Sequence, residues 1–313
     1  MTQLPVRLVP FKFCVGEWTV FSISLPMQSW TPPLLDAPAP AERPNPPPDF
    51  VLDAASQGFA LRGLPVTATQ PTLERRAPFL CYSPLQYWHC YIELAGGFES
   101  YQKKFSAKTR STIQRKVRKF AEHSKGTIDW RTYKQPQDVR EFLRLAHEVS
   151  QHTYQEKQFD AGIPTSEEFA LEAEALAARD ELRAYLLFDN GEPVSYLFCP
   201  VREGTLIYAY LGYRPDYRQH SVGTVLQWLA LEQIFAEGCF RCFDFTEGQS
   251  DHKRLFSTHQ RQCANVFFLR PSLRNAALVR AHLLSDRLST WIGALLDRWG
   301  LKSKVKRLMR SFR

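Results

Sequence analysis

The chain lacks the features of several protein classes. None of its apolar runs approaches the ~18 residues of a membrane-spanning helix, and it contains no internal repeat. Its seven cysteines show no metal-ligand spacing, so we expect no metal site. Cys239 and Cys242 form a C-x-x-C pattern, but the second lies in an apolar, strand-like stretch, which favours two buried thiols. The odd cysteine count and the absence of a signal peptide predict a protein of the reducing cytoplasm.

Acidic residues are scarce in two stretches of a chain whose net charge is +8. Residues 103–125 contain nine Lys or Arg and one acid, Glu122, and residues 298–313 contain seven Lys or Arg and no acid. Since these stretches alone carry net charges of +8 and +7, the rest of the chain is acidic on balance. The basic charge is therefore local and predicts anionic partners at particular faces.

The pattern of apolar residues predicts three regions. Residues 1–28 read as a pair of strands, and eight prolines within 32–48 predict an extended loop or linker, so 1–100 is a strand-rich region. Helical periodicity begins at Phe105, and helices are expected over 137–157 and 165–180 before three strands joined by tight turns. We therefore expect an α/β domain over 101–272 and a basic helical tail over 273–313.

The most informative segment is 206–245, which reads as a strand, a polar turn, an amphipathic helix and a second strand. The turn from Arg218 to Gly223 leads into the helix, which is expected to end at Gly238. Backbone N–H groups at such a helix start lack partners and lie at the positive end of the helix dipole, which predicts a phosphate site. The second strand must join an otherwise antiparallel sheet in parallel, so we predict a mixed, mostly antiparallel sheet flanked by helices.

Four motifs in this order resemble the GNAT acyltransferase superfamily and, more narrowly, the CelD/BcsL-type acetyltransferases, which are related to the FemAB transferases. They are FSAKTRSTIQRK (105–116), SQHTYQ (150–155), GYRPDYRQHSVGTVL (212–226) and DFTEGQSDHKRLF (244–256). The superfamily's phosphate loop, Q/R-x-x-G-x-G/A, is matched with Ser221 at the first glycine. The last motif usually reads D-F-x-x-G-x-x-x-Y-K, and His252 stands where tyrosine is usual. The resemblance covers a little over half of the chain.

The resemblance implies a GNAT-like fold with an acyl-CoA, in particular acetyl-CoA, as co-substrate. Coenzyme A would lie where the fourth and fifth strands of that fold splay apart. The implied contacts to pantetheine are Leu211, Gly212 and Tyr213, and those to pyrophosphate are Arg218, Gln219, His220, Ser221, Val222, Gly223 and Thr224. Residues 1–100 have two interpretations, a second, reduced GNAT-like half or extra strands beside the catalytic domain.

Candidate catalytic residues follow the second strand of segment 206–245. Acyl transfer needs a base for an amine or hydroxyl acceptor and a donor toward the thioester oxygen. Asp244, Glu247 and His252 are the candidate bases, while Lys253 either keeps a carboxylate ionised or orients an anionic substrate. For each we keep a structural alternative: a capping turn at 218–224, a strand-end pairing for Asp244 and a packing role for His252. On resemblance alone, the acceptor-binding candidates are Tyr154 and Gln155, and we add Arg110 of the basic stretch.

The expected function is an acyl-CoA-dependent N- or O-acyltransferase, an acetyltransferase, that acts on an envelope or exopolysaccharide component or its precursor. The basic stretch 103–125 then binds a CoA phosphate, an acidic glycan or RNA, or it is a solvated face. The basic tail either contacts an anionic membrane surface, which would place the protein at the inner face of the membrane, or packs as a helix with a solvated end. Two alternatives remain: a FemAB-like transferase that uses aminoacyl-tRNA, and a non-catalytic GNAT-like module that binds a glycan or a biosynthetic partner.

Overall fold

The computed structural model describes residues 4–15, 18–152, 162–248 and 250–298. It divides into two compact units, a terminal unit made of Met1–Tyr87 and Gln262–Arg313 and a central unit made of Trp88–Arg261. Strands β5 (Phe79–Glu93) and β12 (His259–Leu269) contribute residues to both units. Within the part of the chain that is described, no helix has the length and apolar character that a membrane crossing requires.

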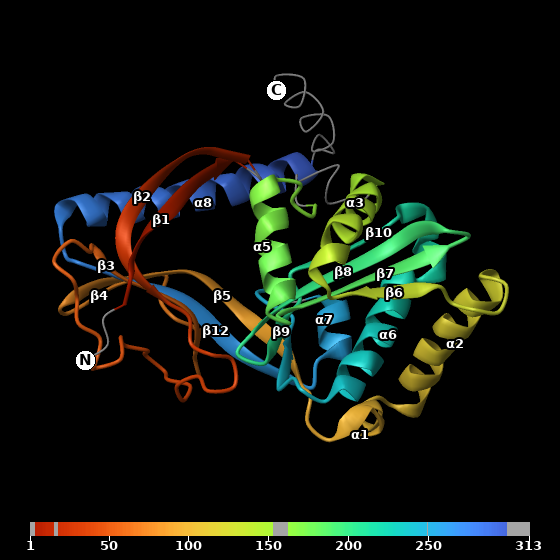
Figure 1. Cartoon of the computed structure of the whole chain (residues 1–313). Helices are drawn as coiled ribbons and strands as arrows, with labels where there is room; N and C mark the ends of the chain where they lie inside the picture. Colours follow the sequence, from red (N-terminus) through yellow and green to blue (C-terminus); the bar gives the residue numbers. More distant parts are fainter. Residues whose placement is uncertain (1–3, 16–17, 153–161, 249, 299–313) are drawn as a thin grey trace. The chain divides into compact units, whose positions relative to one another are not determined.

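The terminal unit consists of paired strands and one long helix (Figure 1). Strands β1 (Val6–Val15) and β2 (Trp18–Trp30) pair antiparallel, which confirms the two strands predicted over 1–28. Strand β3 (Gly58–Pro65) pairs in parallel with β2 and antiparallel with β12, and β4 (Leu73–Arg76) pairs with β5. Helix α8 (Leu273–Arg298) packs on β1 and forms the described part of the tail expected over 273–313.

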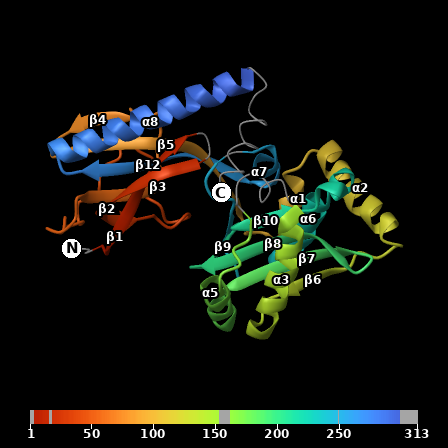
Figure 2. The ribbon, with the colours of Figure 1, turned by 90° about the horizontal axis from the view of Figure 1, so that it is seen from above.

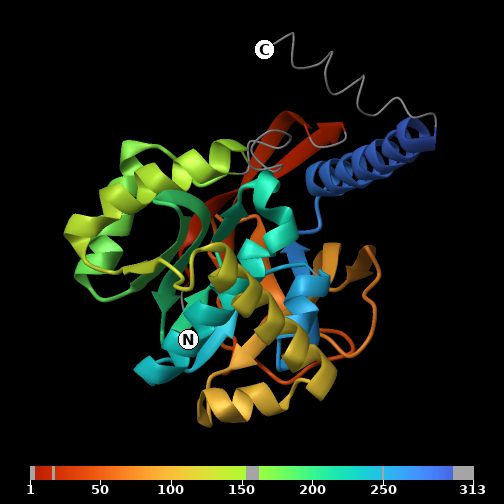
Figure 3. The same ribbon diagram turned by 90° about the vertical axis from the view of Figure 1, so that its right-hand side faces the viewer.

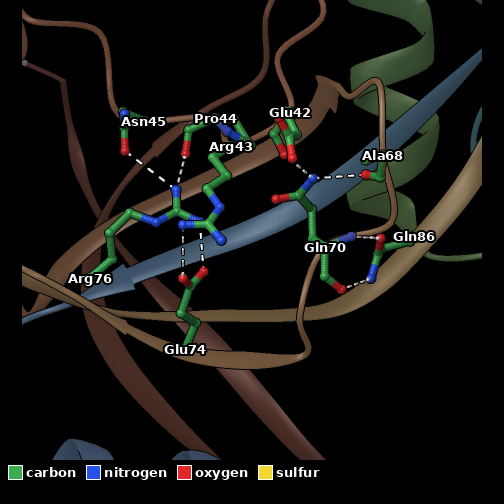
Figure 4. A network of polar contacts seen from close by, with 9 residues as sticks. All are labelled: Glu42, Arg43, Pro44, Asn45, Ala68, Gln70, Glu74, Arg76 and Gln86. Atoms are coloured by element: carbon green, nitrogen blue, oxygen red, sulfur yellow. Dashed lines mark hydrogen bonds and ion pairs between the residues drawn. The ribbon is translucent and has the colours of Figure 1, made fainter.

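The proline-rich segment 32–48 forms no regular helix or strand, as predicted, apart from one bridge between Ala41 and Val66. Side chains from β4 and from the loop that precedes it bond to this segment (Figure 4). Arg76 Nη1 donates to the carbonyl oxygen of Pro44 at 2.8 Å, and Gln70 Nε2 donates to that of Glu42 at 2.6 Å. Side-chain donors therefore satisfy the carbonyl groups of Glu42 and Pro44.

The central unit contains a sheet in the order β5-β11-β9-β8-β7-β6, with β10 paired to β8. Its own strands are β6 (Trp130–Tyr133), β7 (Leu182–Asp189), β8 (Glu192–Arg202), β9 (Thr205–Ile207), β10 (Tyr210–Tyr213) and β11 (Cys242–Asp244). Only β9 and β11 pair in parallel among these described strands. The mixed, mostly antiparallel sheet predicted from the sequence is confirmed.

Helices cover both faces of this sheet (Figures 1 and 2). One face carries α1 (Gly97–Lys103), α2 (Ala107–His123) and α6 (Val222–Glu237), and the other carries α3 (Pro136–His152) and α5 (Glu167–Ala178). On the first of these faces α2 packs against α6, and Figure 3 shows these two helices in gold and cyan. Both faces of β7 are buried, so its residues 184–188 form a continuous apolar run rather than an alternating one.

Local signals placed most of these elements correctly. Ser106 caps α2 by accepting a hydrogen bond from the Thr109 N–H at 3.2 Å, and α6 ends at Gly238, whose φ of 64° lies in the left-handed region. Asn190 and Gly191 have positive φ at the predicted β7–β8 turn. Strands β3 and β4, helix α1 and the short helix α7 (Asp251–Phe256) were not predicted.

The single strand expected over 205–213 is divided into β9 and β10 in the structure. Its parallel pairing with β11 ends at Ile207 and Asp244, and the last bond there is from the Tyr208 N–H to the Asp244 carbonyl at 2.8 Å. Beyond this point β10 pairs only with β8 among the described strands. This is the splay between two strands that the resemblance implied.

An added methyl group should change the free energy of unfolding in different directions at two glycines near this division. A Cβ on Gly212 would lie 2.3 Å from Cε1 of Tyr196, whereas one on Gly223 would lie 3.5 Å from Cδ1 of Tyr213, an ordinary contact. We expect Gly212→Ala to lower the free energy of unfolding by about 1–3 kcal/mol through overpacking. Gly223→Ala should leave it unchanged or raise it by up to about 1 kcal/mol, because alanine favours the helix. Urea unfolding of both variants measures the difference, and equal stabilities would contradict this account of Gly212.

Candidate functional site

A cavity of about 650 Å³ lies in the central unit where β10 and β11 have separated. The sheet side is formed by Tyr196, Tyr208, Ala209, Tyr210, Leu211 and Tyr213. A second wall is formed by Arg218 and by the start of α6, from Ser221 to Thr224. The third wall follows β11 and consists of Thr246, Ser250, His252 and Lys253. The structure therefore brings the predicted phosphate loop and two of the four predicted catalytic residues to one cavity.

The edge of β10 that faces away from β8 has no strand partner among the described strands. Strand β10 bonds to β8 along its other edge, with Gly212 opposite Tyr196, and the Gly212 carbonyl also accepts a hydrogen bond from Ser195 Oγ at 2.9 Å. An unpaired strand edge in a cavity offers N–H and C=O groups in the spacing that an extended ligand with amide groups can match. Leu211 and Tyr213, predicted to contact pantetheine, lie on this stretch.

The predicted phosphate loop begins with a short 3-10 helix, η1 (Pro215–His220), and passes into α6 through Ser221. Ser221 has φ 54° and ψ 36°, the left-handed conformation that glycine adopts with least strain. Its side chain does not cap the helix, while its carbonyl accepts from the N–H groups of Thr224 and Val225 at 2.8 and 3.1 Å. The N–H groups of Val222 and Gly223 have no partner within the helix, so they remain available to an anion.

The loop is held in place by a buried carboxylate. Asp189, at the end of β7, accepts a hydrogen bond from the Tyr217 hydroxyl at 2.9 Å and from Ser124 Oγ at 3.1 Å. Its Oδ2 lies 3.1 Å from Nε2 of His123, and the His123 ring stacks on that of His220 with centroids 4.1 Å apart. The hydrogen bonds from Tyr217 and Ser124 and the charge of His123 outweigh burial and lower the pKa of Asp189. Asp189 therefore joins the loop to the C-terminal end of α2.

Helix α7 presents His252 and Lys253 to the cavity. Ser250 caps its start by accepting from the Lys253 N–H at 3.2 Å, and Lys253 Nζ donates to the Glu247 carbonyl at 2.7 Å. Burial, with smaller contributions from the charges of Lys116 and Lys253, lowers the pKa of His252 to about 4. His252 is therefore neutral at pH 7, and its buried Nε2 has no hydrogen-bond partner among the described residues. Burial also lowers the pKa of Lys253.

Two residues near the end of α1 hold the C-terminal end of α7. Lys104 Nζ donates to the carbonyl oxygens of Leu255 and Ser257 at 2.7 and 2.5 Å, and the buried Tyr101 hydroxyl donates to that of Phe256 at 2.7 Å. These carbonyls lie at a helix end, where intrahelical donors are lacking. Burial of its ammonium group lowers the pKa of Lys104 to about 8. The position of His252 therefore depends on residues more than a hundred positions away in sequence.

Asp244 and Glu247 are not among the residues that line the cavity. Asp244 Oδ1 lies 2.5 Å from His89 Nε2 and accepts a hydrogen bond from the Thr246 N–H at 2.7 Å. The structure thus places Asp244 in the support of the turn that follows β11, which corresponds to the structural alternative for this residue. The Glu247 side chain is exposed, and its backbone carbonyl receives Lys253.

The other predicted site residues lie elsewhere or outside the description. Arg110 is half-buried in α2 and does not line the cavity. Tyr154 and Gln155 lie outside the described residues. Gln219 and His220 belong to η1 but do not line the cavity themselves, although the adjacent Arg218 does.

The cations of α2 form an exposed row without acidic partners. Lys108, Arg115, Arg118 and Lys119 are exposed, and none makes an ion pair with a carboxylate of the described residues. By contrast, Arg140 on α3 is paired with two carboxylates, at 2.6 Å each. The charge of Lys116 reaches His252, so this helix also affects the electrostatic potential in the cavity.

Sequence reasoning missed several contributors to the site. Tyr196 lines the cavity from β8, and Tyr208 and Tyr210 also line it, although their sequence pattern indicates only sheet residues. His89 is the partner of Asp244 across 155 positions, a separation over which no local pattern extends. The tyrosines could have been noted as alternate residues near the predicted splay, but His89 had no comparable signal.

Comparisons with known proteins agree with this geometry. Residues 107–254, just under half of the chain, match the family model described as an acetyltransferase (GNAT) domain. This stretch contains α2, the phosphate loop and most of α7, and it lies within the central unit. No curated protein matches the chain.

Solved structures with a similar fold are distant. The C-terminal domain of a putative lysylphosphatidylglycerol synthetase from Agrobacterium fabrum is 10% identical, with a TM-score of 0.47 and 72% of each chain covered. L-PGS from Bacillus licheniformis is 14% identical, with a TM-score of 0.46 over 74% of this chain and 72% of that one. FemX is 9% identical, with a TM-score of 0.45 over 68% and 72%. At such low TM-scores and identities these likenesses carry no argument about function.

The low pKa of His252 should appear in the pH dependence of stability. The unfolded histidine takes up a proton near its ordinary pKa of 6.5, whereas the folded one does so only near 4. Stability is therefore highest above pH 6.5 and falls as the pH is lowered toward 4, because the unfolded state binds more protons in this window. We expect the urea midpoint of His252→Gln to fall less between pH 7 and about pH 4 than that of the wild type. If the urea midpoints of the two proteins change equally with pH, His252 is not buried as described.

Proposed function

We propose that the central unit is an acyl-CoA-dependent acyltransferase that transfers an acetyl group from acetyl-CoA to an amine or hydroxyl of an envelope or exopolysaccharide component or its precursor. The observation that carries this proposal is the cavity, which joins two features. One is the edge of β10 that has no strand partner among the described strands, and the other is the set of N–H groups at the start of α6 that have no partner within the helix. These two features bind different parts of one ligand class, an extended chain with amide groups attached to a pyrophosphate.

The residues present fit the donor. The N–H groups of Val222 and Gly223 would receive the pyrophosphate, and Leu211 and Tyr213 would pair with the pantetheine amides. Arg218 and Lys253 are the charged side chains of the cavity wall, and no carboxylate is among the described lining residues. An anionic ligand is therefore favoured throughout the cavity. Ser221 does not prevent this binding, because it already adopts the backbone conformation that the glycine pattern requires.

His252 is the residue best placed to act as the general base. It is neutral at pH 7, it lines the cavity, and its Nε2 is buried without a partner among the described residues. Bound acetyl-CoA would supply a thioester carbonyl carbon for attack. As the acceptor forms its bond to this carbon and the carbon–sulfur bond breaks, His252 accepts the acceptor's proton and can return it to the leaving thiolate. Lys253 supplies positive charge beside the developing oxyanion.

The acceptor side of the cavity is aromatic. Tyr208, Tyr210 and Tyr213 line it, and tyrosine side chains suit an acceptor that combines apolar faces with hydrogen-bonding groups. Such a combination is typical of a sugar or an amino sugar. This is the basis for proposing a glycan component rather than a small aliphatic amine.

Binding of acetyl-CoA tests the proposal directly. We expect saturable binding of acetyl-CoA to the full chain by calorimetry, and weakening by roughly tenfold or more (~1.4 kcal/mol or more) in Gly223→Trp, because the indole fills the cavity beside Tyr213. Ala236→Trp is the matched control, since it places the same ring at an exposed position of the same helix and should bind like the wild type. Absence of binding at millimolar acetyl-CoA, or equal binding by both variants, would refute the proposal.

His252→Gln then separates catalysis from binding. We expect acetyl-CoA to bind this variant with near-normal affinity, while acetyl transfer to amino-sugar acceptors slows by roughly 10²-fold or more. If the wild type binds acetyl-CoA tightly but acetylates none of a panel of amino sugars and glycan precursors, the non-catalytic alternative is favoured instead.

One observation favours a second candidate, a transferase that uses an aminoacyl-tRNA donor. The exposed cations of α2 lack acidic partners, and such a row suits an RNA backbone. Binding of bulk tRNA that falls steeply with salt, and that is weakened by Arg115→Gln with Arg118→Gln but not by Arg140→Gln, would support this donor. Salt-insensitive or undetectable tRNA binding would exclude it.

A further inference from the structure

Helix α8 has a second apolar face that is exposed in the described part of the chain. Its inner face packs on β1, where Leu278 and Val279 are buried beside Phe11. Farther along, Leu284, Leu288 and Trp291 are 64%, 55% and 62% exposed. The spacing of four and three residues places these three on one side of the helix, away from Val279. We call this row, Leu284, Leu288 and Trp291, the outer stripe.

Arginines follow one border of the outer stripe. Arg280, Arg287 and Arg298 are exposed and are separated by seven and eleven residues, spacings that return to nearly the same side of a helix. Arg280 and Arg287 lie four residues before Leu284 and Trp291, respectively. Neither Arg280 nor Arg287 makes an ion pair with a carboxylate in the described ranges.

The acidic residue near the middle of α8 lies on the other side. Asp286 is within 3.4 Å of His282 Nδ1, and the His282 ring packs against Phe11 and Phe13 of β1. Negative charge is thus directed to the packed side of the helix, while positive charge borders the exposed apolar side. Exposed leucine and tryptophan side chains cost free energy in water, so solubility alone does not account for the outer stripe.

We propose that the outer stripe of α8 docks on the surface of an anionic lipid bilayer, with Leu284, Leu288 and Trp291 at the level of the acyl chains and the arginines at the phosphates. Amphipathic helices that lie in the bilayer interface combine a leucine and tryptophan face with basic residues along its border. The chain beyond the described part of α8 adds further basic residues and no acid, which increases attraction to a negative surface.

Charge favours this occupant over a second copy of the chain. Two copies that met through the outer stripe would bring the arginine rows together, whereas a surface of anionic headgroups complements them. The interfacial preference of tryptophan points the same way, since its ring is apolar and its N–H remains able to bond to water or headgroups. The proposal does not depend on the acyl-transfer reaction, because α8 belongs to the terminal unit and the cavity to the central one.

Flotation of the full chain with lipid vesicles tests this surface. We expect binding to vesicles of equal parts phosphatidylglycerol and phosphatidylcholine, little binding to pure phosphatidylcholine, and weakening with added salt. The variant Leu284→Gln/Leu288→Gln/Trp291→Gln should bind the anionic vesicles at least about tenfold more weakly, because each glutamine removes apolar contact. The matched control is Leu85→Gln/Leu171→Gln/Trp88→Gln, which changes side chains that are also exposed, at 40%, 54% and 45%. It should bind like the wild type.

Tryptophan fluorescence gives a second measurement that does not depend on the folding of the triple variant. Lipids brominated on their acyl chains should quench the emission of the wild type more than that of Trp291→Phe. Equal quenching, equal vesicle binding by the stripe variant and the wild type, or no binding to anionic vesicles would overturn the proposal. A wild-type dimer by light scattering that becomes monomeric in the stripe variant would instead assign the stripe to a second copy.

Discussion

Hydrogen bonding between β9 and β11 ends at Tyr208, and the candidate site depends on this ending. Up to it, Leu206 and Phe243 are fully buried in one core. Past it, β10 stays with β8, while the chain after Asp244 turns through Thr246, whose φ is 61°, toward α7. The divergence leaves one strand edge unpaired and opens the cavity beside the start of α6. A sheet that continued to pair would have no room for a ligand and no free backbone groups to bind it.

The two polar walls of the cavity are fixed from the same helical pair. At the end of α1, Lys104 and Tyr101 bond to the last carbonyls of α7 and so position His252. At the end of α2, Ser124 and His123 contact Asp189, which in turn receives Tyr217 of the phosphate loop. The stretch from α1 to α2 therefore supports both α7 and the phosphate loop. None of its residues lines the cavity, but its charges affect the electrostatic potential there. The basic composition of this stretch indicates an anion-binding or solvated face and does not indicate its structural role.

The sequence predicted those parts of the fold and site that depend on local chemistry. The cap of α2, the turn at Asn190 and Gly191 and the end of α6 each follow from residues within a few positions of one another. The phosphate loop was located for the same reason. The His89–Asp244 pair, the support of α7 by Lys104 and the contribution of Tyr196 involve residues that are close only after the sheet has formed. A six-residue helix such as α7 is also too short to give a periodic signal.

Ser221 shows that the backbone conformation usual for glycine can be kept when the residue is not glycine. The loop keeps the left-handed turn without glycine, at a strain of about 1 kcal/mol that its surroundings must offset. A pattern that requires glycine at this position would pass over every chain that solves the turn in this way, including those with asparagine or aspartate, which tolerate the same conformation. The backbone torsion angles at this position are therefore a more sensitive criterion than residue identity for finding distant proteins with such a loop.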